Sequence, residues 1–348
     1  RIQLAETQSA ENDMRQSIDR QKAALASFPV VSQQLSSIDF RIATATFLGN
    51  KNLAASGYSD ANSTGAGIGD SAAYAGRVEY LNDIWEASGD FQEVGKDYNP
   101  AVGFTPRREY RLYNPEFTWS PRPKTRHRFI RRFRFGLDPT VYTDLQNRKQ
   151  SVNLDLMPFR LELHSGDNVE VKVSPSYERL DDPFQIAQGV ILPGNSDYNF
   201  TRYRIALNTA NQRVVALHPN VEWGSFFSGD RTQYAFGVDV RPRTGLRINT
   251  TYEYNRISLP EGRFNTRLLR VVADTQFSPF MYLVNNVQYD SVSRLLGWQA
   301  RFRWIVRPGN DVFVVYTHNW VENQLDPNAR FQTVDRRGAA KVVYTKRF

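Results

Sequence analysis

The chain has 348 residues, with 44 Lys and Arg against 36 Asp and Glu, a formal net charge of +8 and no cysteine. The lack of cysteine excludes disulfides, thiolate metal sites and cysteine nucleophiles, and the lack of a long apolar run excludes a membrane-spanning helix. An aromatic content of 13% argues against disorder, since disordered chains are poor in aromatic residues. The chain begins at Arg1 without a signal-like apolar stretch, so we expect a processed or truncated form.

Residues 9–28 are the one stretch with a helical pattern. Met14 and Ile18 lie four positions apart, good helix formers follow, and Pro29 ends the pattern. We expect residues 1–36 to form an N-terminal segment that acts as a linker, a loop insertion or a plug. No Pro/Ser-rich linker divides the rest of the sequence, so residues 37–348 are predicted to form one domain.

From Ser37 onward, apolar and polar residues alternate with a period of two, which predicts β-strands. In 296–306, Leu296, Trp298 and Phe302 alternate with Gln299, Arg301 and other polar or small residues. The same alternation is found in 126–137, 169–178, 201–209, 233–241, 246–255 and 267–277. In 151–163 the phase breaks near Met157 and Pro158, which predicts a β-bulge.

Each predicted strand has an apolar, aromatic face and a polar face that is often occupied by arginine. A soluble β-sandwich also alternates, but three features favour a membrane barrel. The strands are about 9–13 residues long, the connections alternate between short and long, and aromatic residues lie toward strand ends as in the girdles of membrane barrels. These predicted girdle residues are Trp119, Trp223, Trp304, Trp320 and Tyr344.

The predicted fold is therefore an all-β, transmembrane, antiparallel up-and-down β-barrel in a bacterial outer membrane. Short connections near 49–52, 165–168 and 241–245 alternate with long ones near 60–72, 93–107 and 180–198, although those near 227–231, 258–264 and 290–294 are short and break the rule. We count about seventeen strands, whereas bacterial single-chain barrels have even numbers. The prediction is 16–18 strands, and the missing strand is either Arg1–Glu6 or sequence outside this chain.

The C-terminus carries a separate signal. Val342, Tyr344 and the terminal Phe348 lie on one face of a final alternating strand. This pattern resembles the assembly signal of bacterial outer-membrane barrels, although Lys346 stands where that signal usually has an apolar or aromatic residue. The resemblance implies recognition by the barrel-assembly machinery during insertion.

Four segments carry a family resemblance: residues 94–108, 177–184, 264–270 and 296–316. Together they resemble the C-terminal outer-membrane barrel region of a bacterial family of unknown function that usually carries an N-terminal carbohydrate-binding domain of the family-9 type. The resemblance spans roughly residues 37–348 and implies the fold and the location. It supplies no catalytic residues, and this chain has no carbohydrate-binding sandwich.

Arginine is the most prominent candidate for a functional role. If the aromatic faces contact lipid, the basic rows line the lumen, because a charge facing lipid costs about 2–4 kcal/mol at mid-bilayer. One interpretation is a lumen that attracts anions. The other is that the arginines pair with Glu86, Asp90, Glu170, Glu178, Asp239, Glu253 and Asp274 and brace the wall or hold a plug. The predicted lumen residues are Arg126, Arg128, Arg132, Arg134, Arg202, Arg204, Arg301 and Arg303.

Other functional classes have weaker support. A nucleic-acid groove combines basic and stacking groups, whereas here they occupy opposite faces. The four histidines form no metal-binding spacing, so no metal, cofactor or enzymatic activity is predicted. A surface hydrolase using His318 is the weakest alternative, and a girdle position beside Trp320 suits this histidine better. The sequence therefore predicts a channel or transporter, or else a plugged barrel that anchors a periplasmic or surface partner, surrounded by outer-membrane lipid and lipopolysaccharide.

Overall fold

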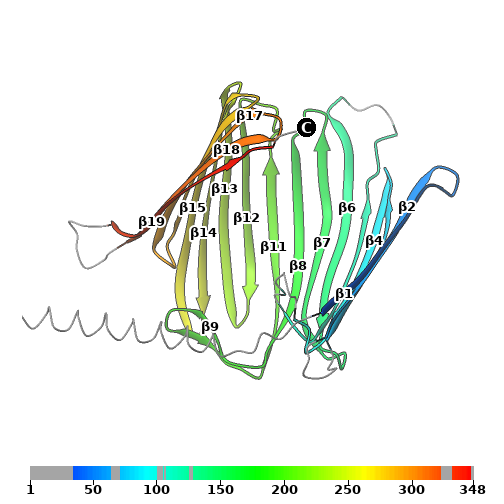
Figure 1. Ribbon diagram of the computed structural model, residues 1–348. Helices are drawn as coiled ribbons and strands as arrows, with labels where there is room; N and C mark the ends of the chain where they lie inside the picture. Colours follow the sequence, from blue (N-terminus) through cyan, green and yellow to red (C-terminus); the bar gives the residue numbers. More distant parts are fainter. Residues whose placement is uncertain are drawn as a thin grey trace, which may run out of the picture.

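The computed structural model describes residues 34–63, 71–99, 105, 107–124, 128–322 and 331–345. Within these ranges the chain forms nineteen β-strands and no helix (Figure 1). The predicted helix at 9–28 and the N-terminal segment up to residue 33 lie outside the described residues. The strands are β1 (Gln34–Phe47), β2 (Lys51–Ser63), β3 (Ala72–Leu81), β4 (Trp85–Val94), β5 (Tyr110–Trp119), β6 (Ile130–Thr143), β7 (Lys149–Leu163), β8 (Asn168–Leu180), β9 (Phe184–Ala187), β10 (Val190–Leu192), β11 (Ser196–Asn208), β12 (Val215–Phe226), β13 (Gly229–Arg243), β14 (Leu246–Leu259), β15 (Gly262–Ser278), β16 (Met281–Asp290), β17 (Leu295–Arg307), β18 (Asn310–Glu322) and β19 (Phe331–Val343).

Seventeen of these strands form one antiparallel sheet in which neighbours in the sequence are neighbours in space. The order is β1 to β8 followed by β11 to β19, with β8 paired to β11, and β9 pairs with β10 in a separate hairpin. The up-and-down topology and the count of about seventeen strands are confirmed. The alternation of apolar and polar residues was enough to predict this topology, because each strand of the large sheet pairs with the next one along the chain.

The strand boundaries follow the predicted ones with one main exception. The register of β7 against β8 shifts between Leu156 and Phe159, which confirms the bulge near Pro158, where proline has no N–H to donate to the ladder. The strand predicted at 126–137 begins later, at Ile130. Arg128 and Phe129 form a bend before it, and residues 125–127 lie outside the described residues.

The two faces of the sheet differ in exposure. Tyr234, Phe236 and Tyr252 on the apolar face are 52%, 46% and 40% exposed, so no second layer of the described chain covers this face. Polar-face side chains make contacts across an intervening strand: Arg134 of β6 lies 3.0 Å from Glu86 of β4, and Gln92 of β4 donates to Tyr58 of β2 at 2.8 Å. Side chains converge in this way only on the inside of a curve, so the polar face is concave and the apolar face convex.

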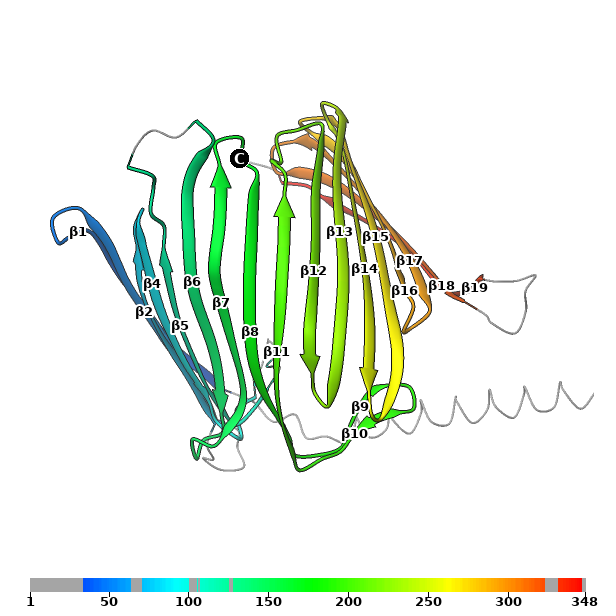
Figure 2. The same cartoon turned by 180° about the vertical axis from the view of Figure 1, so that it is seen from behind.

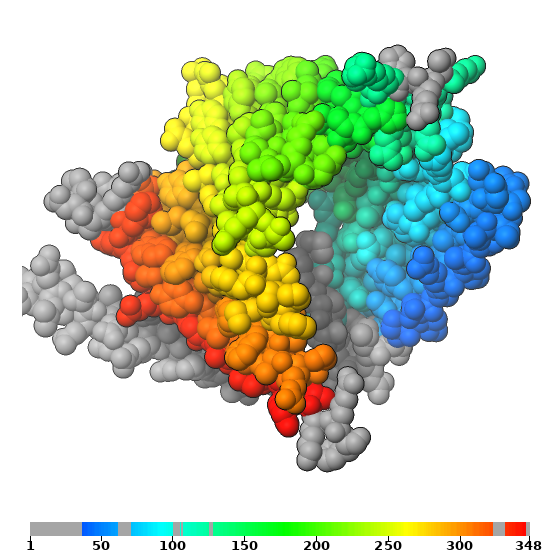
Figure 3. Space-filling model, turned by 90° about the horizontal axis from the view of Figure 1, so that it is seen from above, coloured from blue at the N-terminus to red at the C-terminus, as the bar shows by residue number. Residues whose placement is uncertain are grey.

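The described strands curve strongly without closing into a ring. Figure 3 shows the blue N-terminal and red C-terminal strands on separate arms of the curved sheet. Within the described ranges, no pairing joins β1 to β19, and each has one paired neighbour, β2 or β18. Because seventeen strands alternate in direction, β1 and β19 run the same way and cannot complete an antiparallel ring with each other. The predicted closed barrel is therefore not reached by these strands.

The two ends of the sheet carry different connections. The turns at 48–50, 82–84, 164–167, 244–245, 279–280 and 308–309 share one end, which we call the short-connection end. The strand ends joined by the β4–β5 connection and by 181–195 lie at the opposite, long-connection end, together with short turns at 227–228 and 260–261. The predicted alternation holds, with the departures that the sequence already indicated and a further one at 209–214.

The long β8–β11 connection is folded, whereas the sequence predicted only a loop at 180–198. Its β9–β10 hairpin lies against the long-connection ends of β12 to β15 (Figure 2). Leu192 is 0% exposed and Val190 is 6% exposed, and both pack on Ile257 and Leu259 of β14. These two β14 residues lie on the concave face, so the hairpin covers the concave wall at this end.

Candidate functional site on the concave face

Ion pairs between strands dominate the concave face. At the centre of one cluster, Glu162 of β7 is 9% exposed and lies 2.6 Å from Arg132, 3.3 Å from Arg160 and 3.9 Å from Arg134. An isolated buried carboxylate is strongly unfavourable, and only well-placed cations offset its desolvation. The three arginines therefore make this position tolerable and tie β6 to β7.

Similar pairs continue around the sheet. Most join neighbouring strands, so they connect strands in register and stiffen the wall. The further pairs are Arg134–Glu86 (3.0 Å), Arg160–Glu170 (3.0 Å), Arg77–Asp90 (2.6 Å), Arg111–Glu93 (2.5 Å), Arg202–Glu222 (3.1 Å), Arg247–Asp239 (2.6 Å), Arg303–Asp311 (3.1 Å) and Lys172–Asp155 (3.8 Å).

The predicted basic rows divide into three groups in the structure. Four of these arginines form ion pairs, namely Arg132, Arg134, Arg202 and Arg303. Arg204 and Arg301 form no salt bridge with any described residue. Arg128 lies before β6, with its guanidinium 5.5 Å from the Phe129 ring centre, and Arg126 lies outside the described residues.

The predicted acidic partners divide in the same way. Glu86, Asp90, Glu170 and Asp239 pair with arginine, as the bracing interpretation expects. Within the described part of the chain, Glu178, Glu253 and Asp274 form no salt bridge. Bracing therefore accounts for most of the charge on this face, and a smaller set of cations remains available.

The predicted girdle tryptophans lie near the two ends of the strands on the convex face. Trp119 and Trp304 lie toward the short-connection end, and Trp223 and Trp320 lie toward the long-connection end. Trp85 of β4, which the sequence analysis did not single out, stacks on Trp119 at 5.6 Å. The tryptophans form only short rows. They lie near strand ends because their positions in the sequence are close to the ends of the alternating segments.

The ring of His318 stacks on that of Trp320, with 3.8 Å between centroids. His318 Nε2 also lies 3.0 Å from Thr333 Oγ1. His318 therefore lies beside Trp320, and the girdle role of both residues stays a prediction. At the C-terminus, Val342 and Tyr344 are 71% and 75% exposed, whereas Phe348 lies outside the described residues, so the assembly signal stays a prediction.

An aromatic cluster that the sequence did not predict lines the concave wall under the hairpin. Phe200 of β11 lies 5.8 Å from Phe226 of β12 and 5.4 Å from Phe227, and Tyr198 lies 5.3 Å from Phe227. Together with the hairpin they exclude water from this end of the wall. The apolar run Val190–Leu192 indicated that this part of the connection is buried. The surface that buries it could not be predicted, because the wall residues come from strands distant in sequence.

One carboxylate connects two turns at the short-connection end. Asp167 accepts hydrogen bonds from the Ser165 hydroxyl at 2.7 Å and the Ala210 amide at 2.8 Å, and pairs with Arg213 at 2.6 Å. These contacts, first the hydroxyl of Ser165, hold the pKa of Asp167 below its usual value. The β7–β8 turn is thereby fastened to the β11–β12 connection.

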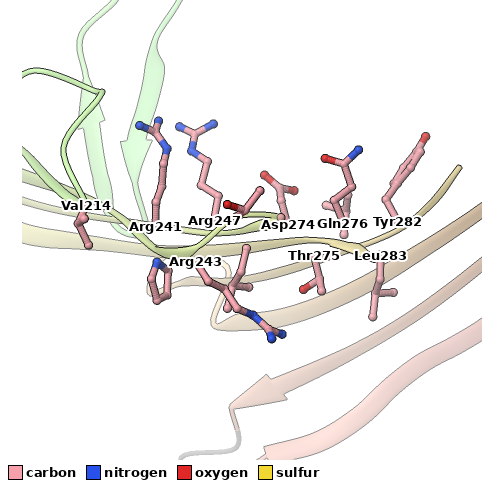
Figure 4. Close-up of a pocket in the computed structure, with 14 residues that line it drawn as sticks. Val214, Arg241, Arg243, Arg247, Asp274, Thr275, Gln276, Tyr282 and Leu283 are labelled. Atoms are coloured by element: carbon pink, nitrogen blue, oxygen red, sulfur yellow. The ribbon is translucent and has the colours of Figure 1, made fainter. Parts of the chain in front are cut away.

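A groove of 840 Å³ lies at the same end, around the β13–β14 turn. Figure 4 shows Arg241, Arg247 and Asp274 on one side of the sheet, and Arg243 and Leu283 on the other. The groove is broad and shallow, and no sequence pattern predicted it. In the described chain we find no group of three or more metal-ligating side chains, and no helix there has the length and hydrophobicity needed to span a membrane.

Comparison with known proteins shows a weak structural likeness. No protein-family model and no curated protein matches the sequence. The crystal structure of a point mutant of the ferric enterobactin receptor from Pseudomonas aeruginosa aligns with a TM-score of 0.39 and 11% sequence identity, over 89% of this chain and 72% of that chain. A TM-score this low does not establish a shared fold, so the all-β, antiparallel assignment made here rests on the strand pairings themselves.

Proposed function

We propose that the chain is the wall of a bacterial outer-membrane pore or transporter with an arginine-bearing lumen that favours anionic solutes. The convex face is the lipid-facing surface, and the concave face lines the solute path. Lipid and lipopolysaccharide surround the strands, and the barrel-assembly machinery inserts them. The resemblance to the outer-membrane family with family-9-type carbohydrate-binding domains agrees with this location, and the proposal includes no enzymatic step.

The observation that carries the proposal is the exposure of large apolar side chains along the whole convex face. Tyr234, Phe236 and Tyr252 lie in mid-strand and are 40–52% exposed. Soluble proteins rarely expose an apolar surface of this extent, and in a sandwich a second sheet would bury it. A bilayer is the remaining environment that suits an apolar outside and an ion-paired inside.

Anion preference is supported by the arginines on the concave face that form no ion pair with a described carboxylate. Arg301 lies exposed on the concave face in mid-strand, without a carboxylate partner among the described residues. Arg303, two residues on, is held by Asp311. Rings of unpaired arginine select for anions, so Arg301 is the residue through which selectivity is most simply tested.

The test is single-channel conductance of the purified, folded chain in a planar bilayer, with the reversal potential measured under a salt gradient. We expect a stable conductance with anion preference. Arg301→Glu should shift the reversal potential toward cations, because it reverses a charge on the solute path. Arg243→Glu, which makes the same charge change on the convex face at the end of β13, is the matched control and should leave the reversal potential nearly unchanged.

A second candidate function is a plugged or docking barrel that anchors a periplasmic or surface partner. The β9–β10 hairpin favours it, because Leu192 and Val190 fasten the hairpin to the concave wall. A folded protein that stays silent in the bilayer, but co-purifies with one stable partner, would support this candidate over the pore. If wild type and Arg301→Glu had the same reversal potential, the proposal that Arg301 selects for anions would be contradicted, whichever candidate function is right.

A further inference from the structure

Three arginines lie together on the concave face of β11 and β13, beside the aromatic cluster under the hairpin. In the strand register, Arg202 of β11 lies opposite Gly224 of β12, and Gly224 lies opposite Arg231 of β13. Arg204 lies two residues further along β11, opposite Glu222. The register therefore brings residues 202, 204 and 231 to one patch of the wall.

The position between Arg202 and Arg231 holds no side chain. A Cβ atom on Gly224 would lie 2.2 Å from the Thr201 carbonyl oxygen and 3.0 Å from Arg202 Cα. Such contacts with backbone atoms cannot be relieved by moving a side chain, so the backbone there accommodates only glycine. The two guanidiniums thus flank a gap in the side-chain layer.

The positive charge at this patch is only partly neutralised. Arg202 pairs with Glu222 at 3.1 Å, but Arg231 donates to neutral oxygens, to Asn255 Oδ1 at 2.9 Å and to Gln233 Oε1 at 2.6 Å. Glu222 and, more weakly, Glu253 also attract Arg231, while Arg202 repels it. Arg204 Nε is buried and has no hydrogen-bond partner among the described residues. Three guanidiniums therefore face two carboxylates.

Aromatic rings lie beside two of these guanidiniums. The Arg231 guanidinium lies 5.4 Å from the centre of the Phe226 ring, and that of Arg202 lies 5.8 Å from Phe200. Cation–π contacts of this kind orient the planar fork of arginine. Low local polarity strengthens any further charge–charge contact that these forks make.

We propose that Arg202, Arg204 and Arg231 form a binding site for an oxyanion group, a phosphate or carboxylate carried by the solute, seated over Gly224. The planar guanidinium fork matches the geometry of such oxyanions and binds them with charge-assisted hydrogen bonds. The inference rests on the proposed function and gives it a substrate class. It also adds Arg231, which the sequence analysis placed in the connection near 227–231 and which the structure places in β13.

The experiment is isothermal titration calorimetry of the full folded chain in detergent, with inorganic pyrophosphate as the probe. Arg231→Gln is expected to weaken binding about tenfold or more, since a hydrogen bond to a charged group contributes enough for such a loss. Arg243→Gln removes the same charge from the exposed end of β13 and is the matched control, expected to bind like wild type. Glu222→Gln is expected to strengthen binding severalfold, because it releases Arg202 from its carboxylate.

The gain expected for Glu222→Gln separates the site from a folding defect, since a misfolded variant cannot bind more tightly. No heat of binding in the wild-type protein, equal losses in Arg231→Gln and Arg243→Gln, or an unchanged affinity in Glu222→Gln would each overturn the site. The titration needs no passage through the protein. Ion conduction without this binding pattern would support the pore and contradict the oxyanion site. The binding pattern without conduction would support the site and contradict the pore.

Discussion

At the residue scale, the concave face shows how arginine is made compatible with a crowded wall. The sequence offers many arginines on alternate positions, and many of them pair with a carboxylate on a nearby strand. Glu162 illustrates the principle, because three arginines converge on its single buried carboxylate. The few arginines left over, such as Arg204 and Arg301, are then the ones free to act on a solute.

Glu162→Gln should destabilise the protein by roughly 3 kcal/mol, because it leaves three crowded cations without their counter-charge. Unfolding in urea, followed by tryptophan fluorescence, measures this change. Asp83→Asn is the control, since it breaks the exposed Arg122–Asp83 pair, for which about 1 kcal/mol or less is expected. Equal effects of the two changes would contradict the central role of Glu162.

Asp167 provides a pH-dependent test outside the strands. Its lowered pKa means that the carboxylate stabilises the fold above the unfolded-state pKa of about 3.9, and that this contribution is lost as the pH falls through the folded-state pKa. Asp167→Asn should therefore cost about 1 kcal/mol at neutral pH and progressively less in acid. Paired urea titrations across this range measure the difference, and a constant cost at every pH would count against the assignment.

At the scale of single strands, alternation decides which face each side chain joins. Adjacent residues in one strand point to opposite faces, so neighbouring positions form matched pairs of probes. In the middle of β14, Tyr252 lies on the convex face and Thr251 on the concave face, and both are exposed. The proposed lipid environment predicts opposite tolerance to charge at these two positions.

Tyr252→Arg is expected to cost about 2–4 kcal/mol in folding into lipid bilayers, the penalty for a charge on the lipid face near mid-membrane. Thr251→Arg should cost much less, because its guanidinium would enter the solvated interior. Folding equilibria in liposomes measure both variants. If Tyr252→Arg lost less folding free energy than Thr251→Arg, the assignment of the two faces would be reversed.

The β9–β10 hairpin is an element whose place depends on a few apolar contacts. Leu192→Ala removes a fully buried side chain and should weaken hairpin docking by about 2–4 kcal/mol. The expected result is faster proteolytic cleavage within 181–195. Ile191→Ala is the matched control, because Ile191 is 54% exposed, and its cleavage rate should stay close to that of wild type.

At the scale of the whole molecule, the sheet has two edges that run in the same direction. Half of the amides in β1 and β19 point away from their only neighbours, β2 and β18, because ladder bonds alternate between sides. These amides should exchange with deuterium far faster than amides of β13 and β14, which are paired on both sides. Hydrogen exchange with residue-level readout measures this, and protected edges would reveal an additional strand closing the ring.

The sequence by itself determined the strands, their approximate number, their chain-order pairing and the polar or apolar character of each face. These follow from period-two alternation and from connections short enough to make each strand pair with the next. The bulge near Pro158 could also be predicted, because proline has no N–H group to donate to the neighbouring strand. The tertiary structure alone decided which arginines are paired, because the partner of Arg134 lies two strands away on β4 and the gap over Gly224 depends on register. It also decided the folded hairpin and the unpaired edges, since the hairpin's contacts join residues far apart in the chain and closure depends on strand direction summed over the whole sheet.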